Sequence, residues 1–282
     1  MIPLLQRADV RALSDQDWVD RHKRSITEPV QDGRAWPGFP DESVQKAFVG
    51  SSYEHALQEA WNFHRFTLQA VADFQRRPQA VRYLDFGCGW GRIGRFFLRE
   101  FERGDMAGVD VDPGMVEFCT AAGVPGHHLV VENGRAMPFA DESFRLVTAY
   151  SVFTHLPEPL FTAWMRELLR VTCKGGLVVF TVEPPRFLDF VAAIDPAAPE
   201  SGWHAALAGA LGPVEERRRE LAKRGATYLP TGGGPHRPPE SYGDMVVSPD
   251  FISAAAGRAG RLRRYLDDEP QFWQAVAVVQ KR

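Results

Sequence analysis

Hydrophobic and aromatic residues recur at two different spacings along the chain. In the stretch Asp41–Phe74 the spacing is three, four or seven residues, at Leu57, Trp61, His64, Leu68, Val71 and Phe74. This period is typical of an amphipathic helix, and Pro78 ends it. We therefore expect an N-terminal helical segment, residues 1–79, ahead of a second domain, residues 80–282. Residues 1–40 are interrupted by prolines and are a poor candidate for a core of their own.

Beyond this segment, short apolar runs alternate with amphipathic ones. Five runs predict strands: Val81–Phe86, Met106–Val111, His128–Glu132, Phe144–Tyr150 and Leu177–Val182, the last after a turn at Gly175–Gly176. Intervening segments predict helices at Ile93–Phe101, Gly114–Ala122 and Glu158–Val171. Near the C-terminus a helix is expected at Pro249–Ala259 and two strands at Leu262–Leu266 and Ala275–Val279. Strands separated by helices form βαβ units, so we expect an α/β fold with a parallel sheet.

Residues 184–244 break this alternation, and we expect them to form an insertion. The charged run Glu215–Arg224 offers the i,i+4 pairs Glu215/Arg219 and Glu220/Arg224, which predict a solvated helix face. The run gives way to TGGGPHRPP, whose glycines and prolines predict a loop.

Composition restricts the class of protein and its partners. The 282 residues are 44% hydrophobic and 24% charged, which is typical of a globular protein. The formal net charge of −3 provides no basic field, so we expect neither nucleic acid nor a membrane surface as a partner.

The cysteines and the N-terminus indicate a compartment. Cys88, Cys119 and Cys173 form no CxxC pair, which argues against a disulfide framework and a zinc site. The N-terminus lacks the apolar core of a signal peptide, and no apolar run reaches the ~18 residues of a membrane span. We expect a cytoplasmic monomer or homodimer.

The stretch VRYLDFGCGWGRIGRFFLREF places a glycine-rich turn between a strand and a helix. Asp85 ends the strand, and Gly87, Gly89 and Gly91 follow at alternate positions. Glycines let the backbone turn sharply and approach a ligand closely, and the next helix presents free N–H groups. In an open α/β sheet, ligands bind at this edge.

Two classes of cofactor fit the turn. Gly89–Gly94 satisfies the dinucleotide pattern G-x-G-x-x-G, and Asp110 follows at the distance of a ribose-binding acid. However, Asp85 and Trp90 place acidity and bulk where a pyrophosphate would lie. A carboxylate there suits a ligand that carries an ammonium and a sulfonium, such as S-adenosylmethionine.

Five segments in order resemble the motifs of class I S-adenosylmethionine-dependent methyltransferases: DFGCGWGR, GVDVDPGMV, NGRAMPFADESF, SVFTHLPE and LLRVTCKGGLVVFTV. The resemblance covers residues 80–183, with a tail in 245–282. It implies a Rossmann-like, mostly parallel sheet of seven strands with an antiparallel last strand and helices on both faces. It also implies an N-terminal helical lid, an inserted substrate region at 184–244, and S-adenosylhomocysteine as product.

The resemblance also implies which residues bind the cofactor. Asp85 would hold the methionine amino group, Asp110 the ribose hydroxyls, and the Ser151 backbone the methionine side. The remaining members are Gly87, Cys88 and Gly89 in the turn, Val111 and Met115 against the adenine, and Asn133 and Gly134 at its amino edge. Family members often carry Asp where this chain has Arg145 and Asn133.

Several of these residues have purely structural alternatives. Asp110 or Asp112 could cap the helix that starts at Pro113. Met115 could belong to the core, and Cys88 could pack as a small hydrophobic side chain because nothing beside it would lower its pKa.

An oxygen nucleophile needs a base, and His155 is the best-placed candidate. It could instead be a hydrogen-bonded histidine that only supports the SVFTHLP motif. Substrate-region candidates are Trp203, His204, Tyr228, His236, Tyr242 and Asp244. The fourth strand ends in YSVF and lacks the Asn/Asp-Pro-Pro-aromatic motif of enzymes that methylate nucleic-acid amines. The same place lacks the carboxylates that a divalent metal would need.

We therefore predict methyl transfer to an oxygen of a small molecule or sugar-containing metabolite, in natural-product biosynthesis, without a metal. Transfer to nitrogen or carbon is the alternative within this class. An NAD-dependent oxidoreductase and a non-catalytic nucleotide-binding module are alternatives outside it.

Overall fold

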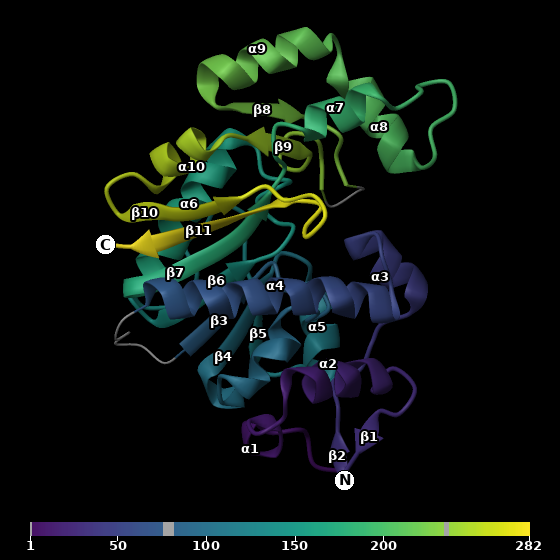
Figure 1. Cartoon of the computed structure of the whole chain (residues 1–282), viewed down its shortest axis with the longest axis vertical. Coiled ribbons are helices and arrows are strands. Elements are labelled where there is room, and N and C mark those ends of the chain that lie inside the picture. Colours follow the sequence, from purple (N-terminus) through teal and green to yellow (C-terminus); the bar gives the residue numbers. More distant parts are fainter. Residues whose placement is uncertain (1, 76–81, 234–236) are drawn as a thin grey trace. The chain divides into compact units, whose positions relative to one another are not determined.

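The computed structural model describes residues 2–75, 82–233 and 237–282. Internal contacts divide the chain into two units, coloured along the sequence in Figure 1. The first unit comprises Met1–Ala149 and Thr172–Leu177, and the second comprises Tyr150–Val171 and Val178–Arg282.

A sheet of seven strands is the largest β element in the described residues, with the order β10-β11-β7-β6-β3-β4-β5. Its strands are β3 (Arg82–Phe86), β4 (Met106–Asp110), β5 (His127–Val130), β6 (Phe144–Ala149), β7 (Thr172–Val182), β10 (Gly260–Leu266) and β11 (Ala275–Lys281). β3 pairs in parallel with β4 and β6, and β4 pairs in parallel with β5. β10 and β11 are antiparallel. The predicted Rossmann-like, mostly parallel sheet is confirmed.

The central strands are apolar because they are buried. Tyr83 and Leu84 in β3 and Val109 in β4 are fully buried, as expected of strands covered on both faces. β7 corrects one prediction, since it starts at Thr172 and not at Leu177. Gly175 is accommodated inside the strand with φ 77°, so the expected turn before the strand is not formed.

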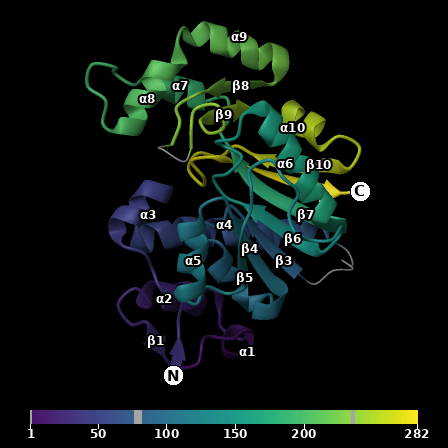
Figure 2. The ribbon, with the colours of Figure 1, turned by 180° about the vertical axis from the view of Figure 1, so that it is seen from behind.

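The N-terminal helix is interrupted once. α3 (Glu42–Val49) ends at Gly50, whose φ of 72° is left-handed, and α4 (Tyr53–Phe74) begins three residues later. Glycine commonly closes a helix in this conformation. The predicted continuous run Asp41–Phe74 is therefore two helices. α4 passes in front of β3 in Figure 1 and behind it in Figure 2.

Residues 2–40 contribute to the core of the first unit. They form α1 (Arg7–Val10), α2 (Asp15–Arg24), β1 (Val30–Gln31) and β2 (Arg34–Ala35). Trp18 is fully buried and its indole N–H donates to the Phe96 carbonyl at 3.1 Å. As expected, this segment has no core of its own, because its aromatic residues pack on the segment after the glycine-rich turn.

The segment after the glycine-rich turn is a 3₁₀ helix, η1 (Gly94–Arg99), and not the predicted α-helix Ile93–Phe101. Its hydrogen bonds are shortened to i→i+3, as from the Phe96 amide to the Ile93 carbonyl. A second 3₁₀ turn, η2 (Arg103–Asp105), precedes β4. The predicted helices that follow are present as α5 (Pro113–Ala121) and α6 (Glu158–Val171).

The expected insertion carries its own secondary structure in the second unit. It contains α7 (Phe187–Ala192), α8 (Gly202–Leu211), α9 (Val214–Arg224) and the hairpin of β8 (Ala226–Leu229) and β9 (Asp244–Val247). These elements share a small core of Phe187, Leu188, Val191, Leu207, Leu211, Leu229 and Val246. The chain then enters α10 (Pro249–Ala256).

The charged face of α9 is only partly as predicted. Glu220 pairs with Arg224 at 3.3 Å, whereas Glu215 pairs with Arg218 at 2.5 Å, one position earlier than expected. Arg219 instead donates to the Glu215 backbone carbonyl. None of the helices in the described ranges is long and apolar enough to cross a bilayer.

Candidate functional site

Asp85, the penultimate residue of β3, is a buried carboxylate of the first unit. It accepts hydrogen bonds from the Gly94 amide at 2.9 Å and from the Thr148 hydroxyl at 3.2 Å. No Lys or Arg of the described residues forms an ion pair with it. Burial raises the pKa of Asp85 to about 7, against the opposing hydrogen bonds. A buried carboxylate in this state favours a cationic ligand.

The glycines of the turn have different roles. A Cβ on Gly91 would lie 2.4 Å from a methyl carbon of Val124, so this glycine is required for packing. A Cβ on Gly89 would meet open space, which leaves its backbone accessible. Gly87 and Gly89 both have positive φ, at 69° and 48°. The turn therefore combines a tightly packed end with an open one.

Asp110 ties this turn to the end of β4. Its carboxylate accepts from the Gly89 amide at 2.8 Å and from the Asp112 amide at 3.0 Å. Carboxylate oxygens accept several hydrogen bonds, so this group is suited to a ribose diol. The next side chain, Val111, is 48% exposed and offers an apolar surface.

Asp112 caps α5, as the structural alternative proposed. Its carboxylate accepts from the amides of Gly114 at 2.8 Å and Met115 at 3.3 Å. Met115 itself is half-buried, and Asn133 and Gly134 are exposed after β5.

Cys88 packs with Cys119 and Val124 in a small apolar cluster. A hydrogen bond with Cys119, together with burial, raises the pKa of the Cys88 thiol well above its ordinary value. All three cysteines are buried free thiols. Cys88 therefore contributes packing and its backbone, not reactivity.

The first unit fits S-adenosylmethionine in both charge and space. Asp85 is an unpaired carboxylate that suits an ammonium, and Asp110 is a carboxylate that suits a diol. The open side of Gly89 and the exposed Val111 leave room for an adenosyl group. These residues would hold the cofactor.

Ser151, in the second unit, has a strained backbone. Its φ of 58° is left-handed, which non-glycine residues adopt rarely, and which concentrates at functional sites. The Ser151 amide donates to the Thr181 hydroxyl at 2.7 Å, and its hydroxyl accepts from the Gln274 amide at 3.0 Å. Hydrogen bonds thus hold both its backbone and its side chain.

His155 is fixed by the hairpin residues of the second unit. Its Nδ1 lies 2.8 Å from the Gly243 carbonyl and 3.8 Å from Asp244 Oδ1, and its ring stacks on Tyr242 with centroids 4.4 Å apart. Burial lowers the pKa of His155, although Asp244 opposes the shift. The imidazole is therefore neutral at pH 7.

Asp244 links several predicted substrate residues. It is 1% exposed, accepts from Thr231 at 2.6 Å and from the Trp203 indole at 3.4 Å, and lies beside His155. Burial raises the pKa of Asp244, against the opposing effects of His155 and of the hydrogen bonds from Thr231 and Trp203. The structure thus brings Trp203, His155, Tyr242 and Asp244 into one cluster.

The other described substrate-region candidates adjoin this cluster: the ring centroids of His204 and Trp203 are 5.4 Å apart, and Asp244 acts electrostatically on Tyr228. His204 hydrogen-bonds Ser201 at the start of α8. Tyr228 donates to the Pro239 carbonyl, and burial raises its pKa to about 12. His236 lies outside the described residues.

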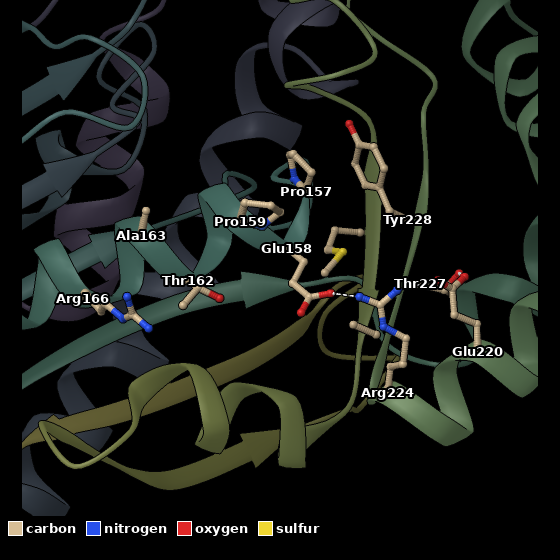
Figure 3. Close-up of a pocket in the computed structure, with 12 residues that line it drawn as sticks. Pro157, Glu158, Pro159, Thr162, Ala163, Arg166, Glu220, Arg224, Thr227 and Tyr228 are labelled. Atoms are coloured by element: carbon tan, nitrogen blue, oxygen red, sulfur yellow. Dashed lines mark hydrogen bonds and ion pairs between the residues drawn. The ribbon is translucent and has the colours of Figure 1, made fainter.

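A cavity of about 640 Å³ lies between α6, α9 and β8 in the second unit (Figure 3). Tyr228 lines it, together with Pro157 and Pro159. Glu158 and Arg224 point toward each other in Figure 3 and form an ion pair. Their charges are thus satisfied by each other, and the His155 cluster contributes no lining residue to this cavity.

Glu183, which follows β7 directly, was missed by the sequence analysis. It is 2% exposed, its Oε1 accepts from Gln274 at 3.2 Å, and its Oε2 has no hydrogen-bond partner. Burial and the charge of Asp244 raise the pKa of Glu183 to about 8. The available signal was an acid placed immediately after an apolar strand.

Across the described ranges, His, Cys, Asp and Glu side chains form no group of three that could hold a metal.

A family model for a methyltransferase domain matches residues 84–176. A ribosomal protein L11 methyltransferase from Cupriavidus taiwanensis is 30% identical over 200 residues, 69% of this chain and 64% of that protein. A fatty-acid O-methyltransferase from Mycolicibacterium smegmatis is 28% identical over 134 residues, 46% of this chain and 48% of that protein. The chain thus spans less than two thirds of the length of these relatives.

Solved structures show the same fold at low sequence identity. A magnesium protoporphyrin IX methyltransferase from Synechocystis with bound SAH gives a TM-score of 0.51 at 14% identity, covering 98% of this chain and all of that one. A methyltransferase from Clostridium acetobutylicum gives 0.51 at 10% identity, covering 78% and 91%. The family match, these folds and the geometry of the first unit agree. Residues 84–176 thus form a methyltransferase domain, in a chain with the fold of S-adenosylmethionine-dependent methyltransferases, and S-adenosylmethionine is its cofactor.

Proposed function

We propose that the protein transfers a methyl group from S-adenosylmethionine to an oxygen of a small molecule, with His155 as the base. The observation that carries the proposal is the neutral His155 ring, which the described residues anchor through Nδ1. Two relatives are named as O-methyltransferases, of fatty acid and of malonyl-[acyl-carrier protein]. A role in natural-product biosynthesis belongs to the same proposal.

The anchoring of His155 determines its tautomer. A carbonyl oxygen can only accept a hydrogen bond, so Nδ1 carries the proton that it donates to Gly243. Nε2 therefore keeps its lone pair. The lowered pKa keeps the ring unprotonated at pH 7, and Asp244 stabilises the imidazolium that forms when Nε2 takes a proton. A hydroxyl acceptor loses its proton to this nitrogen.

The first unit supplies the cofactor's binding groups. Asp85 pairs with the methionine ammonium, and Asp110 accepts from the ribose hydroxyls. When bound, S-adenosylmethionine supplies an electrophilic methyl group. The N-terminal helices would act as the lid. In support, Glu59 of α4 pairs with Arg92 beside the glycine-rich turn at 2.6 Å.

The insertion supplies the acceptor site in this proposal. Trp203 and Trp273 are 40% and 43% exposed, and Phe190 lies between them at centroid distances of 6.0 and 5.0 Å. Exposed aromatic rings in a group are suited to the apolar part of a ligand.

His155→Gln tests the role of the base. Quantitative transfer assays would use a phenol, which must be deprotonated, and a long-chain fatty acid, whose carboxylate needs no base. We expect at least a hundredfold loss of kcat with the phenol, and little change with the fatty acid. Equal losses with both acceptors, or none, would contradict the proposal. Unchanged S-adenosylmethionine affinity serves as the control.

Transfer to a protein is the second candidate. It is favoured by the L11 methyltransferase relative, whose match covers more of this chain than the fatty-acid enzyme does. Incubation of ribosomal protein L11 with labelled S-adenosylmethionine separates the two candidates.

A further inference from the structure

Two buried carboxylates of the second unit lack a cationic partner. Glu183 is 2% exposed, and Asp244 is 1% exposed. Neither forms an ion pair with Lys or Arg within the described ranges. The basic side chain beside Asp244 is His155, which is neutral at pH 7. Arg186, which acts electrostatically on Glu183, is itself paired with Asp267 at 2.8 Å.

Two oxygen atoms of this cluster lack a hydrogen-bond donor. Oε2 of Glu183 and Oε1 of Gln274 are buried and have no partner. The Gln274 oxygen is an acceptor, and Oε2 of Glu183 is an acceptor when Glu183 is ionised; a buried acceptor without a donor is costly. The Gln274 amide already donates to Ser151 and Glu183. A ligand that completes the cluster must therefore bring N–H or O–H groups.

One aromatic ring contacts Asp244, and another belongs to the residue before Gln274, which is the hydrogen-bond partner of Glu183. The Trp203 indole donates to Asp244, and Trp273 directly precedes Gln274 in the sequence. Phe190 joins the two indoles into one exposed aromatic surface. The faces of tryptophan rings attract ammonium groups, and anionic groups next to them add charge pairing.

We propose that Glu183, Asp244 and this aromatic surface form a binding site for a protonated amine, so that the methyl acceptor is an amine-bearing compound. The identification of the ligand as the acceptor rests on the proposed function. Ser151 and Gln274, which are half-buried, connect the carboxylates to the molecular surface.

A matched pair of probes tests the site. Tyramine and para-ethylphenol share a phenol and differ in the amine. We expect tyramine to bind the whole protein at least about tenfold more tightly in calorimetric titrations. Glu183→Gln should abolish this preference, whereas Glu158→Gln, which alters an exposed carboxylate paired with Arg224, should retain it.

The pH dependence provides a second readout. Glu183 interacts electrostatically with Asp244, Arg186 and Tyr265. As Glu183 ionises between pH 6 and 9, the affinity for tyramine should increase. The affinity for para-ethylphenol should not change. Melting temperatures of the variants verify folding. Equal affinities for the two probes, or a preference that survives Glu183→Gln, would overturn the proposal.

Separate measurements of tyramine binding and of methyl transfer distinguish a failure of this proposal from a failure of the proposed function. Selective tyramine binding without methyl transfer, in protein that binds S-adenosylmethionine, supports the amine site and contradicts the proposed function. Methylation of the tyramine nitrogen supports the site and replaces oxygen transfer by nitrogen transfer.

Discussion

At the scale of single residues, burial determines the chemistry of the acids. Asp85 and Glu183 follow the same rule: each lies at the end of an apolar strand, each is almost inaccessible to solvent, and each has a raised pKa. Asp110, at the end of the neighbouring strand, is half-buried and receives two backbone amides. Similar sequence positions thus produce acids with different roles.

The pKa of Asp85 predicts how cofactor affinity changes with pH. Only the carboxylate pairs with the methionine ammonium, so affinity should fall as pH decreases through about 7, approaching tenfold per pH unit below it. Asp85→Asn should bind weakly at every pH and show no such slope. Calorimetric titration of S-adenosylmethionine between pH 5.5 and 8.5 measures both, since each tenfold change in affinity corresponds to about 1.4 kcal/mol of binding free energy. A flat wild-type profile would exclude this pairing.

The same group changes the stability of the ligand-free protein. Its pKa is higher in the folded state than in the unfolded chain, so its contribution is lost as pH rises from about 4 through 7. In urea unfolding, the free energy of unfolding of Asp85→Asn relative to the wild type should therefore be higher at pH 8 than at pH 5. The exposed Asp20→Asn provides the matched control.

Sequence identified Asp85 and Asp110 because a glycine-rich turn and a strand end mark them. Glu183 carries no such mark. Its importance comes from the missing partner of Oε2 and from the proximity of Asp244, 61 positions along the chain. Such pairings depend on tertiary packing, which hydrophobic periodicity does not contain.

At the scale of elements, periodicity predicted the strands well and the breaks poorly. β4 and β6 are buried apolar runs whose limits agree closely with the expected ones. The short hairpin β8–β9 was missed because each strand has four residues, too few for a clear period. The α3–α4 break was missed because the apolar positions that define the period, Leu57 to Phe74, all follow Gly50 and do not test the stretch before it.

Two glycine substitutions test the origin of that break. Gly50 has left-handed φ, so Gly50→Ala should lower the free energy of unfolding by about 1 kcal/mol, although a Cβ would meet open space there. Gly209 lies inside α8 and also has open space. Gly209→Ala should instead raise stability by about 0.5–1 kcal/mol. Chemical denaturation gives both values, and equal signs would contradict the conformational account.

At the scale of the whole molecule, the two units present different chemistry. The first unit presents the acids and the open turn that fit an adenosyl cofactor. The second unit presents His155, two buried carboxylates and exposed aromatic rings, which we assign to the acceptor. The fold and cofactor were predictable from ordered motifs, whereas the acceptor depends on the insertion, whose sequence resembles no motif that we identified.

The most direct test is a thermal-shift titration with S-adenosylmethionine, S-adenosylhomocysteine and NAD. Both adenosyl ligands should stabilise the wild type, by about 2.7 kcal/mol at a hundred times the dissociation constant, and NAD should not. Asp110→Asn should lose most of this effect, while the cap variant Asp112→Asn should keep it. Stabilisation by NAD alone, or by none of the three, would contradict the assignment of this chain's cofactor site.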